Sequence, residues 1–489
     1  MLRQFTVQRV TAVMLFVLIF VMATRAPTDT DTWWHLRSGE HILQQRAVYT
    51  TDPFSHTMAG QPWNYVGWLS QVILHLTYQT AGDAGLALLT ALLATTGMGL
   101  VYRTCVGNVY VRAFALVLGA ATAAVFWSAR PHMASFVLSA LVLYLLHVGR
   151  RGGRGRLWFI PLVMVLWANL HGGFAIGFIL LLGTIAGESL GSLLNGSVSD
   201  AVSWRGVRQL VLISALSVVA VCINPYGPQV LGYPFQTVGI GVLQDFIQEW
   251  ATPNFHERQF LPFAALLLSL YGAAGFSHLR LRWTDLVLTT GTALMALTAA
   301  RNIALFAVVA VPVLTRHVDA ILNERGWHIR TQAAARGAAG WVNLLLIVVI
   351  LLGALLYVAS VLSPQAVAAA QAERLPVRAA AWLNEAHPEG LMFNSYNWGG
   401  YLMFAAPDYP VFADGRTDLY DDVFLRAFLS TWHGLPGWEA TLDTHHIGFV
   451  VIESDGLMAN VMRSDDGWRP VYDDGQAVIF VRAETDAGL

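Results

Sequence analysis

The sequence predicts a polytopic α-helical membrane protein with about eleven transmembrane helices and a small C-terminal α/β domain outside the membrane. Three observations predict this fold class: an apolar composition, hydrophobic stretches that recur along the chain, and arginines concentrated in alternate loops. Of the 489 residues, 55% are hydrophobic and 12% are charged, whereas roughly a quarter of the residues in a soluble protein carry charge. A lipid bilayer is therefore the expected solvent.

Eleven apolar stretches are candidates to cross the bilayer. A cytoplasmic N-terminus places the arginine-rich loops at 150–156, 280–282 and 316–336 inside, as the positive-inside rule requires. We therefore expect a multi-pass protein of the inner (plasma) membrane, with residues 362–489 extracytoplasmic. The stretches are 8–24, 84–102, 111–128, 133–148, 157–170, 174–191, 207–223, 259–277, 284–300, 302–316 and 341–361.

The domain organisation follows from these stretches. Residues 1–361 form the predicted transmembrane domain, and its first outer loop, 25–83, contains two spaced apolar patterns typical of helices that lie along the membrane interface. Residues 362–375 are the expected linker. Residues 376–489 alternate short apolar runs with helical patterns, which predicts a small α/β domain.

Composition also limits the function. The net charge of −2 and the absence of a polybasic tail argue against binding to nucleic acid. All 29 basic residues are arginine, which is typical of a GC-rich bacterial genome and suits a protein of the bacterial cell envelope. The two cysteines, Cys105 and Cys222, form neither a disulfide framework nor a metal cluster by position. The first apolar stretch can be an uncleaved helix or a signal peptide, and the many later spans favour the uncleaved helix.

The first outer loop opens with a motif that suggests chemistry. Asp29 and Asp31 lie two residues apart, and Asp31 is followed by Trp33, Trp34, His35 and Arg37. Paired carboxylates next to a histidine can bind a divalent cation or act as a general base. The same residues also fit a tryptophan belt at the membrane interface with solvated polar neighbours.

Other polar residues occupy the ends of helices on the same predicted outer face. Ionisable residues at such positions are costly and usually face a functional cavity. Arginine and histidine suit a phosphate or pyrophosphate, because they donate charge-assisted hydrogen bonds, although any single member could be a snorkelling side chain. The phosphate-binding candidates are Arg130, His132, His171 and Arg301, and the accompanying candidates are Asn169, Glu249, Trp250 and Asn302.

Two motifs in the C-terminal domain contain further candidates. Residues 394–401 read as a strand that runs into a glycine-marked turn and a helix, and they include Asn397, Trp398 and Tyr401. Residues 412–418 include Asp414 and Arg416 and have the small and acidic residues of a strand end that faces a site. Each motif can equally be a structural turn.

Together these features resemble the GT-C class of membrane glycosyltransferases. The stretch from Asp31 to Arg37 is similar to the Asp-Pro-aromatic-aromatic-Asn-Tyr-Arg stretch of oligosaccharyltransferase catalytic subunits. The stretch from Trp398 to Tyr401, with residues 414–417 after it, resembles the Trp-Trp-Asp-Tyr-Gly region of that family. The aspartate of that region is replaced here by Gly399 and Gly400. About eleven spans is also similar to protein mannosyltransferase-like and arabinose-transfer enzymes.

The resemblance implies inverting transfer of a sugar from a polyprenyl-phosphate-linked donor to an extracytoplasmic glycan, lipid or protein. Asp31, with Asp29 as the second candidate, is implied as the catalytic carboxylate or as a ligand of Mg²⁺ or Mn²⁺. The residues from Trp398 to Tyr401 are implied to lie near the acceptor. Two other functions remain open: a transporter of lipid-linked saccharides, and a membrane scaffold or assembly protein without catalytic activity.

Overall fold

The structure is a computed structural model that describes residues 6–194, 203–238, 249–327 and 338–483. The chain divides into two compact units. The first, which we call the helical unit, consists of Met1–Arg25, Ala84–Pro234 and Gln244–Ser363. The second, the sheet unit, consists of Ala26–Asp83, Phe235–Leu243 and Pro364–Leu489. Part of the arginine-rich 316–336 segment, residues 328–336, lies outside the described residues.

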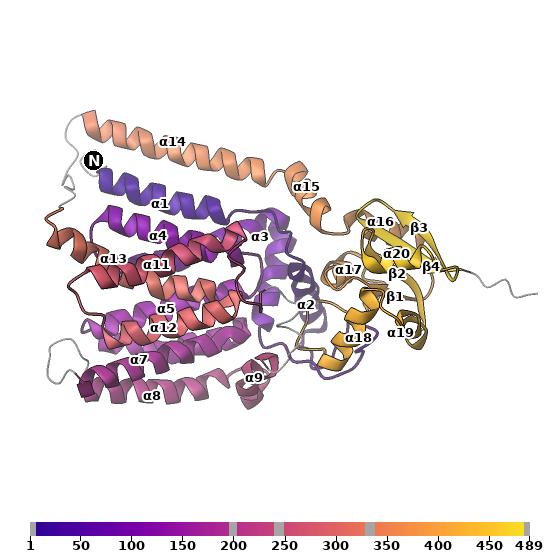
Figure 1. The fold of residues 1–489 in the computed structure, drawn as a ribbon, viewed down its shortest axis with the longest axis horizontal. Coiled ribbons are helices and arrows are strands. Elements are labelled where there is room, and N and C mark those ends of the chain that lie inside the picture. Colours follow the sequence, from indigo (N-terminus) through magenta and orange to yellow (C-terminus); the bar gives the residue numbers. More distant parts are fainter. Residues whose placement is uncertain (1–5, 195–202, 239–248, 328–337, 484–489) are drawn as a thin grey trace, which may run out of the picture. The chain divides into compact units, whose positions relative to one another are not determined.

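The helical unit is a bundle of apolar helices (Figure 1). Eight helices of the described chain are long and apolar enough to cross a membrane, so the structure is that of a multi-pass membrane protein. The bundle as a whole, including helices that are shorter than a membrane span, consists of α1 (Val7–Ala23), the second part of α3 (Trp68–Thr104), α4 (Val109–Ala123), α5 (His132–Arg150), α6 (Ile160–Leu170), α7 (Ala175–Leu194), α8 (Trp204–Val221), α11 (Leu261–Phe276), α12 (Trp283–Thr298), α13 (Ile303–Glu324) and α14 (Ala338–Val361).

The structure does not confirm the predicted number of eleven spans. Three expected spans are not among these eight helices: α1 has 17 residues, α6 has 11 and α12 has 16, which is short of a standard crossing of about 20 residues. The helix α6 is short because Pro161 marks its first turn and the extended backbone of His171 ends it. Hydrophobicity alone therefore located the helices but did not determine their lengths.

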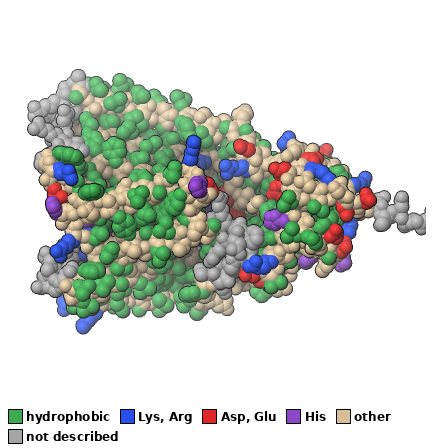
Figure 2. Space-filling view, viewed as in Figure 1, with side chains coloured by type: hydrophobic (Ala, Val, Ile, Leu, Met, Phe, Trp, Pro, Cys, Tyr) green, Lys and Arg blue, Asp and Glu red, His purple; other side chains and the backbone are tan. Residues whose placement is uncertain are grey.

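Apolar residues cover the helical unit both inside and outside. The core is centred on α13, which packs against α4, α11 and α12. Phe306 and Val308 of α13 are fully buried, whereas Leu355 and Leu356 of α14 are 63% and 71% exposed. Figure 2 shows hydrophobic side chains over the visible face of this unit. Exposed leucines on this scale are expected where lipid is the solvent.

The sheet unit contains the C-terminal α/β structure (Figure 1). Its four-stranded sheet has the order β1-β2-β4-β3, in which β1 and β2 are parallel and the other neighbours are antiparallel. Alternating apolar residues of the strands pack against α18 through Phe393, Phe412 and Phe428. The strands are β1 (Leu391–Asn394), β2 (Ile447–Glu453), β3 (Trp468–Asp473) and β4 (Ala477–Arg482). The helices are α2 (Asp31–Gln45), α15 (Pro364–Arg374), α16 (Val377–Ala386), α17 (Gly399–Ala405), α18 (Asp422–Trp432), α19 (Trp438–Thr444) and α20 (Leu457–Met462).

The first loop, residues 26–83, belongs to the sheet unit rather than to the helical unit. Backbone hydrogen bonds attach it to the segment before Asp414: Val411 N donates to Phe54 O (3.2 Å), and His56 N donates to Val411 O (3.1 Å). The helix α3 carries the chain from one unit into the other and is interrupted at Gly82, whose φ of 56° is in the left-handed region that glycine favours.

Candidate functional site

Asp31 is the first residue of α2, the position where a helix stabilises negative charge. Asp29 supports this helix start, because its Oδ1 accepts a hydrogen bond from the backbone N–H of Asp31 (3.0 Å). The two predicted catalytic carboxylates are therefore neighbours with different positions: Asp29 caps the turn and Asp31 begins the helix.

Both C-terminal motifs pack against this helix start. A Cβ atom at Gly415 would overlap the carboxylate of Asp31. A Cβ atom at Gly400 would lie 2.7 Å from the carbonyl oxygen of Thr30 and 3.1 Å from Trp34. The sheet unit thus brings the two segments together with Asp31, although they are far apart in the sequence. There is no space for an aspartate at Gly400, which gives a physical reason for the departure from the oligosaccharyltransferase motif.

Aromatic rings fix the orientation of α2. Trp33 packs edge-on against Tyr401 of α17, with 5.1 Å between ring centroids, and lies 5.2 Å from the ring of Phe404. Trp33, Trp34 and Tyr401 are buried within the unit, and burial raises the pKa of Tyr401 to about 12. Trp33 and Trp34 therefore form part of the sheet-unit core.

Arg416 lies at the centre of a buried network of charged and polar side chains. Its Nε and Nη2 donate to the two carboxylate oxygens of Asp414 (2.8 and 2.7 Å), and its Nη1 donates to Asp52 (2.5 Å). The hydroxyl of Tyr420 donates to Asp414 (3.1 Å), and the guanidinium lies 4.6 Å from the ring centroid of Trp63. Burial alone would lower the pKa of Arg416, but the charges of Asp414 and Asp52 hold it well above its usual value.

This network changes the expected role of two predicted acceptor-side residues. The side chains of Asp414 and Arg416 are both 0% exposed, and their polar atoms are occupied by each other and by Asp52. We therefore expect Asp414 and Arg416 to hold Gly415 against Asp31 rather than to contact an acceptor directly. Asp52 was not predicted, because nothing in the sequence links it to Arg416.

The remaining predicted residues of the sheet unit are placed differently. His35 is buried, and its Nδ1 lies 3.5 Å from the amide nitrogen of Gln71. Arg37 forms an ion pair with Glu40 on the same helix (2.7 Å). Trp398 is buried and Asn397 is exposed, so of these four residues Asn397 is the most accessible to an acceptor.

The residues fit a divalent cation only in part. Within the described ranges, no three His, Cys, Asp or Glu side chains gather as a metal-binding group. Mg²⁺ can also be held by one or two carboxylates together with oxygens of the substrate. Asp31, with Asp29 beside it, is the pair that could contribute in that way.

In the helical unit, a second polar cluster forms at the ends of several helices. Arg130 lies 3.6 Å from Glu249, and Arg301 lies over the ring of Trp250 at 4.2 Å. The backbone N–H of Arg301 donates to the carbonyl oxygen of Glu249 (2.9 Å). Burial alone would raise the pKa of Glu249, but the charges of Arg130, Arg301 and His132 lower it to about 2. Both arginines thus stabilise the charged form of Glu249.

His171 belongs to this cluster, and its hydrogen bonds define the tautomer of its ring. Its Nδ1 accepts a hydrogen bond from Gly173 N (3.1 Å) and lies 2.7 Å from Ser135 Oγ. The hydroxyl of Ser135 accepts from Trp167 Nε1 (2.7 Å), so it donates its own proton to His171. Nδ1 is therefore an acceptor, and the neutral ring carries its proton on Nε2. Burial lowers the pKa of His171 well below its usual value, and nearby cations, beginning with His132, lower it further.

The other helical-unit candidates have polar atoms bonded to the backbone. Nε2 of His132 contacts the carbonyl oxygen of Phe126. The amide of Asn169 donates to Val165 O (2.9 Å) and Ile223 O (2.8 Å), and the amide of Asn302 donates to Met295 O (3.1 Å). Asn169 and Asn302 therefore act as helix-end anchors in this structure.

The structure thus brings the predicted residues together in two groups. Asp29, Asp31, Trp33, Trp34 and Tyr401 lie in the sheet unit with the Asp414–Arg416 segment. Arg130, His132, His171, Glu249 and Arg301 interact in the helical unit. Sequence analysis missed Ser135 and Trp167, which orient His171. Trp167 could have been found from the sequence, because it lies four residues before His171.

Comparisons with known proteins identify the fold. No protein-family model matches the sequence, and no curated protein matches it. The solved structure of the archaeal oligosaccharyltransferase AglB from Archaeoglobus fulgidus, in complex with an inhibitory peptide and a dolichol-phosphate, is similar with a TM-score of 0.60 and 13% identity over 98% of this chain and 75% of that chain. The apo form of the Archaeoglobus fulgidus oligosaccharyltransferase gives a TM-score of 0.59 with the same identity and coverage.

ArnT from Cupriavidus metallidurans in the apo state also matches, with 15% identity over 98% of both chains and a TM-score of 0.48, which is too low to support an argument. The AglB similarity extends over nearly the whole chain and agrees with the resemblance seen in the sequence. The chain therefore has the fold of the GT-C membrane glycosyltransferases.

Proposed function

We propose that this protein is an inverting glycosyltransferase that moves a sugar from a polyprenyl-phosphate-linked donor to an extracytoplasmic acceptor. The observation that carries the proposal is the cluster of Arg130, Arg301 and His171 in the helical unit, which gathers two arginines and a histidine around Glu249. Arginine and histidine side chains gathered at the ends of apolar helices suit a lipid-linked phosphate.

The cluster would bind the phosphate of the donor. Arg130 and Arg301 would supply charge, and the Nε2–H of His171 would supply a neutral, fixed hydrogen-bond donor. In the transfer step the bond between the anomeric carbon and the phosphate oxygen breaks, and the polyprenyl phosphate leaves with the electron pair. Cationic groups stabilise the negative charge that develops on it.

Asp31 would act on the acceptor. As the acceptor oxygen forms its bond to the anomeric carbon from the opposite side, the acceptor O–H loses its proton to the carboxylate of Asp31. Displacement from the opposite side inverts the anomeric centre. Asp29 is the alternative base, but its cap on α2 favours a supporting role. If a divalent cation binds, Asp31 and Asp29 would hold it, and it would supply additional positive charge.

The topology completes the proposal. Arginines in the loops at 150–156 and 280–282 favour a cytoplasmic location for those helix ends. With those helix ends in the cytoplasm, the N-terminus would lie in the cytoplasm of a bacterial cell, and the sheet unit would lie on the extracytoplasmic side of the inner membrane.

The test compares the wild type with Asp31→Asn and Arg301→Ala in membranes of the native host. Two matched variants control for charge loss: Asp408→Asn in an exposed loop of the sheet unit, and Arg258→Ala, which is exposed near the start of α11. Lipid extracts and surface glycans are measured by mass spectrometry. We expect lipid-linked sugar to accumulate and one glycan to disappear in the two site variants, at normal protein levels, and neither change in the controls.

Unchanged lipid and glycan profiles in both site variants would reject the transferase and its site together. If a lipid-linked saccharide accumulates only on the cytoplasmic leaflet, the transporter replaces the transferase. Loss of the glycan in a deletion strain that Asp31→Asn fully restores would instead indicate a scaffold.

A further inference from the structure

A cavity with a second set of polar side chains lies at the other ends of the same helices. The helix α5 begins at His132, beside the cluster described above, and ends at Arg150, which lines the cavity. At 1.5 Å per residue, these two positions are about 27 Å apart along the helix. The cavity is therefore separate from the proposed donor site and lies wholly within the helical unit.

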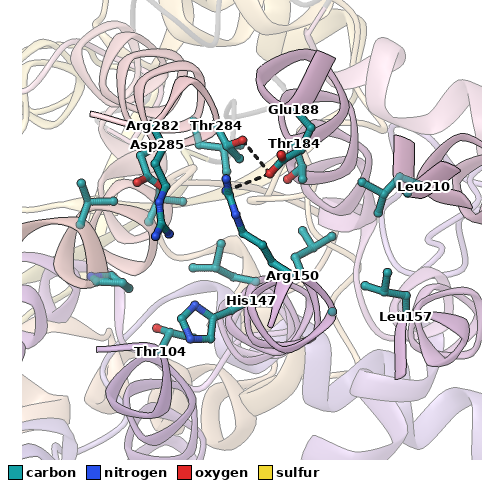
Figure 3. A pocket seen from close by; sticks show the side chains of 18 of the residues that line it. Thr104, His147, Arg150, Leu157, Thr184, Glu188, Leu210, Arg282, Thr284 and Asp285 are labelled. Atoms are coloured by element: carbon teal, nitrogen blue, oxygen red, sulfur yellow. Dashed lines mark hydrogen bonds and ion pairs between the residues drawn. The ribbon is translucent and has the colours of Figure 1, made fainter. Parts of the chain in front are cut away.

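The wall of this cavity carries paired charges. Arg150 forms an ion pair with Glu188 of α7 (2.8 Å), and the hydroxyl of Thr284 donates to Glu188 (3.0 Å). Asp285 is paired with Arg316 of α13. Figure 3 shows Arg150 extending from α5 towards Glu188 and Thr284, with Arg282 and Asp285 on one side of the cavity and Leu157 and Leu210 on the other.

Basic side chains predominate in the described lining of the cavity. Arg150, Arg154 and Arg282 line it, and the acidic residues of the described lining are Glu188 and Asp285. Nε2 of His147 is also buried at this wall with no hydrogen-bond partner among the described residues. An anion that accepts charge-assisted hydrogen bonds suits a lining of this kind.

The cavity is large enough for a phosphate group. Its volume is about 110 Å³, and about 10–15 Å³ of such space holds one water. Several waters, or one phosphate group with the atoms next to it, therefore fit. The rest of the ligand would extend outside the cavity.

Aromatic residues place the cavity at the level of lipid headgroups. Trp158 and Trp204 are 45% and 49% exposed. They belong to the 3-10 helix Arg154–Phe159 and to α8, whose residues line the cavity. Exposed tryptophans mark the interface of a membrane with water, and basic pockets between transmembrane helices at this level suit the head groups of anionic lipids.

We propose that this cavity binds the phosphate group of an anionic phospholipid through Arg282, His147 and Arg150. This site does not depend on the proposed transferase activity. A lipid bound there would join α5, α7 and α12 at the ends opposite the cluster of Arg130, His171 and Arg301 in the same unit.

The experiment uses the full chain purified in a neutral detergent. Its thermal unfolding midpoint is titrated with dioctanoyl phosphatidylglycerol, with dioctanoyl phosphatidylcholine and with inorganic phosphate, because a ligand that binds the folded state raises the midpoint. Arg282→Gln is compared with Arg280→Gln, a matched control two residues away that does not line the cavity. His147→Leu is the second site variant.

We expect phosphatidylglycerol to raise the midpoint and phosphatidylcholine to have little effect. Arg282→Gln should weaken the apparent affinity for phosphatidylglycerol roughly tenfold, since a hydrogen bond to a charged group is lost, whereas Arg280→Gln should leave it unchanged. Glu188→Gln keeps the shape of the side chain and releases Arg150, so it should tighten binding. A purely structural ion pair would give lower stability without tighter binding.

Three results would overturn the proposal. Equal shifts with the two lipids would show that the headgroup charge is not recognised. Equal affinities of Arg282→Gln and Arg280→Gln would move any lipid binding away from the cavity. A shift with inorganic phosphate but not with phosphatidylglycerol would assign the site to a soluble phosphate and reject the lipid.

Discussion

The carboxylate of Asp31 lies directly against the backbone of Gly415, so closely that a methyl group at position 415 would overlap it. The contact joins the first residue of α2 to the segment that contains Asp414 and Arg416. It explains why a glycine occupies the position between these two buried side chains. It also gives the sheet unit a means of fixing the position of the candidate catalytic carboxylate.

Gly415→Ala should therefore displace Asp31 while leaving the fold intact. A displacement of about 1 Å at a reacting group can reduce a rate about 100-fold, and we expect a loss of this size in sugar transfer, measured as turnover of the lipid-linked donor in native membranes. Gly291→Ala, where a Cβ atom meets no neighbour within 4 Å, is the control. Wild-type turnover in Gly415→Ala would show that the position of Asp31 does not control the reaction.

Arg416→Gln should destabilise the sheet unit strongly. The substitution leaves the buried carboxylates of Asp52 and Asp414 facing each other without a cation, and loss of one partner from a buried ion pair costs about 3–5 kcal/mol. Thermal unfolding of the purified protein measures the loss. Arg469→Gln removes an exposed arginine of the same unit and should change stability by less than about 0.5 kcal/mol. Similar midpoints for the two variants would contradict this account of the network.

The Arg416 network also shows where prediction from the sequence ends. The short polar motif at residues 412–418 identified Asp414 and Arg416 as candidates at an expected strand end, but it did not indicate that they form an ion pair. Asp52 lies 364 residues from Arg416, and a turn residue in a long loop carries no signal of such a partner. Sequence periodicity describes local structure, whereas this contact depends on tertiary packing.

The helices also have some features that the sequence predicts and others that depend on the tertiary structure. Apolar stretches located the bundle, and the Asp31 motif indicated the GT-C resemblance that the fold comparison confirms. Hydrophobicity could not reveal that α6 has only 11 residues, because its end depends on the extended backbone at His171. It also could not assign residues 26–83 to the sheet unit, since that assignment depends on the pairing of Phe54 and His56 with Val411.

Glu249 gives a prediction about pH. Its pKa falls from an ordinary value of 4.5 to about 2, so its contribution to stability is complete above pH 4.5 and is lost as the pH falls towards 2. The shift corresponds to at most roughly 3 kcal/mol. Unfolding midpoints between pH 2 and pH 7 should therefore fall more steeply with acid in the wild type than in Glu249→Gln. Parallel curves for the two proteins would show that Arg130 and Arg301 do not stabilise this carboxylate.

Ser135→Ala tests the hydrogen bonds that orient His171. The substitution removes the acceptor of Trp167 Nε1 and the donor to His171 Nδ1, and an unsatisfied buried polar group costs about 1–3 kcal/mol. Ser139→Ala is a matched control one turn later, because the hydroxyl of Ser139 bonds only to Phe136 O of its own helix in the described structure. We expect a lower unfolding midpoint for Ser135→Ala than for Ser139→Ala, and the reverse order would contradict the network.

The tautomer of His171 leads to a separate prediction about ligand binding. With Gly173 N–H and Ser135 O–H both donating to Nδ1, the ring presents its Nε2–H as a fixed donor. The side-chain amide of glutamine reaches the position of Nε2, whereas that of asparagine reaches only the position of Nδ1. His171→Gln should therefore retain more affinity for a polyprenyl phosphate than His171→Asn, with the wild type tightest, as measured by native mass spectrometry of the purified protein. Because Gln and Asn both remove the imidazole and its pKa, a role of His171 as a base would weaken both variants equally. An ordered series would support the hydrogen-bond donor that the structure presents, and equal affinities would reject it.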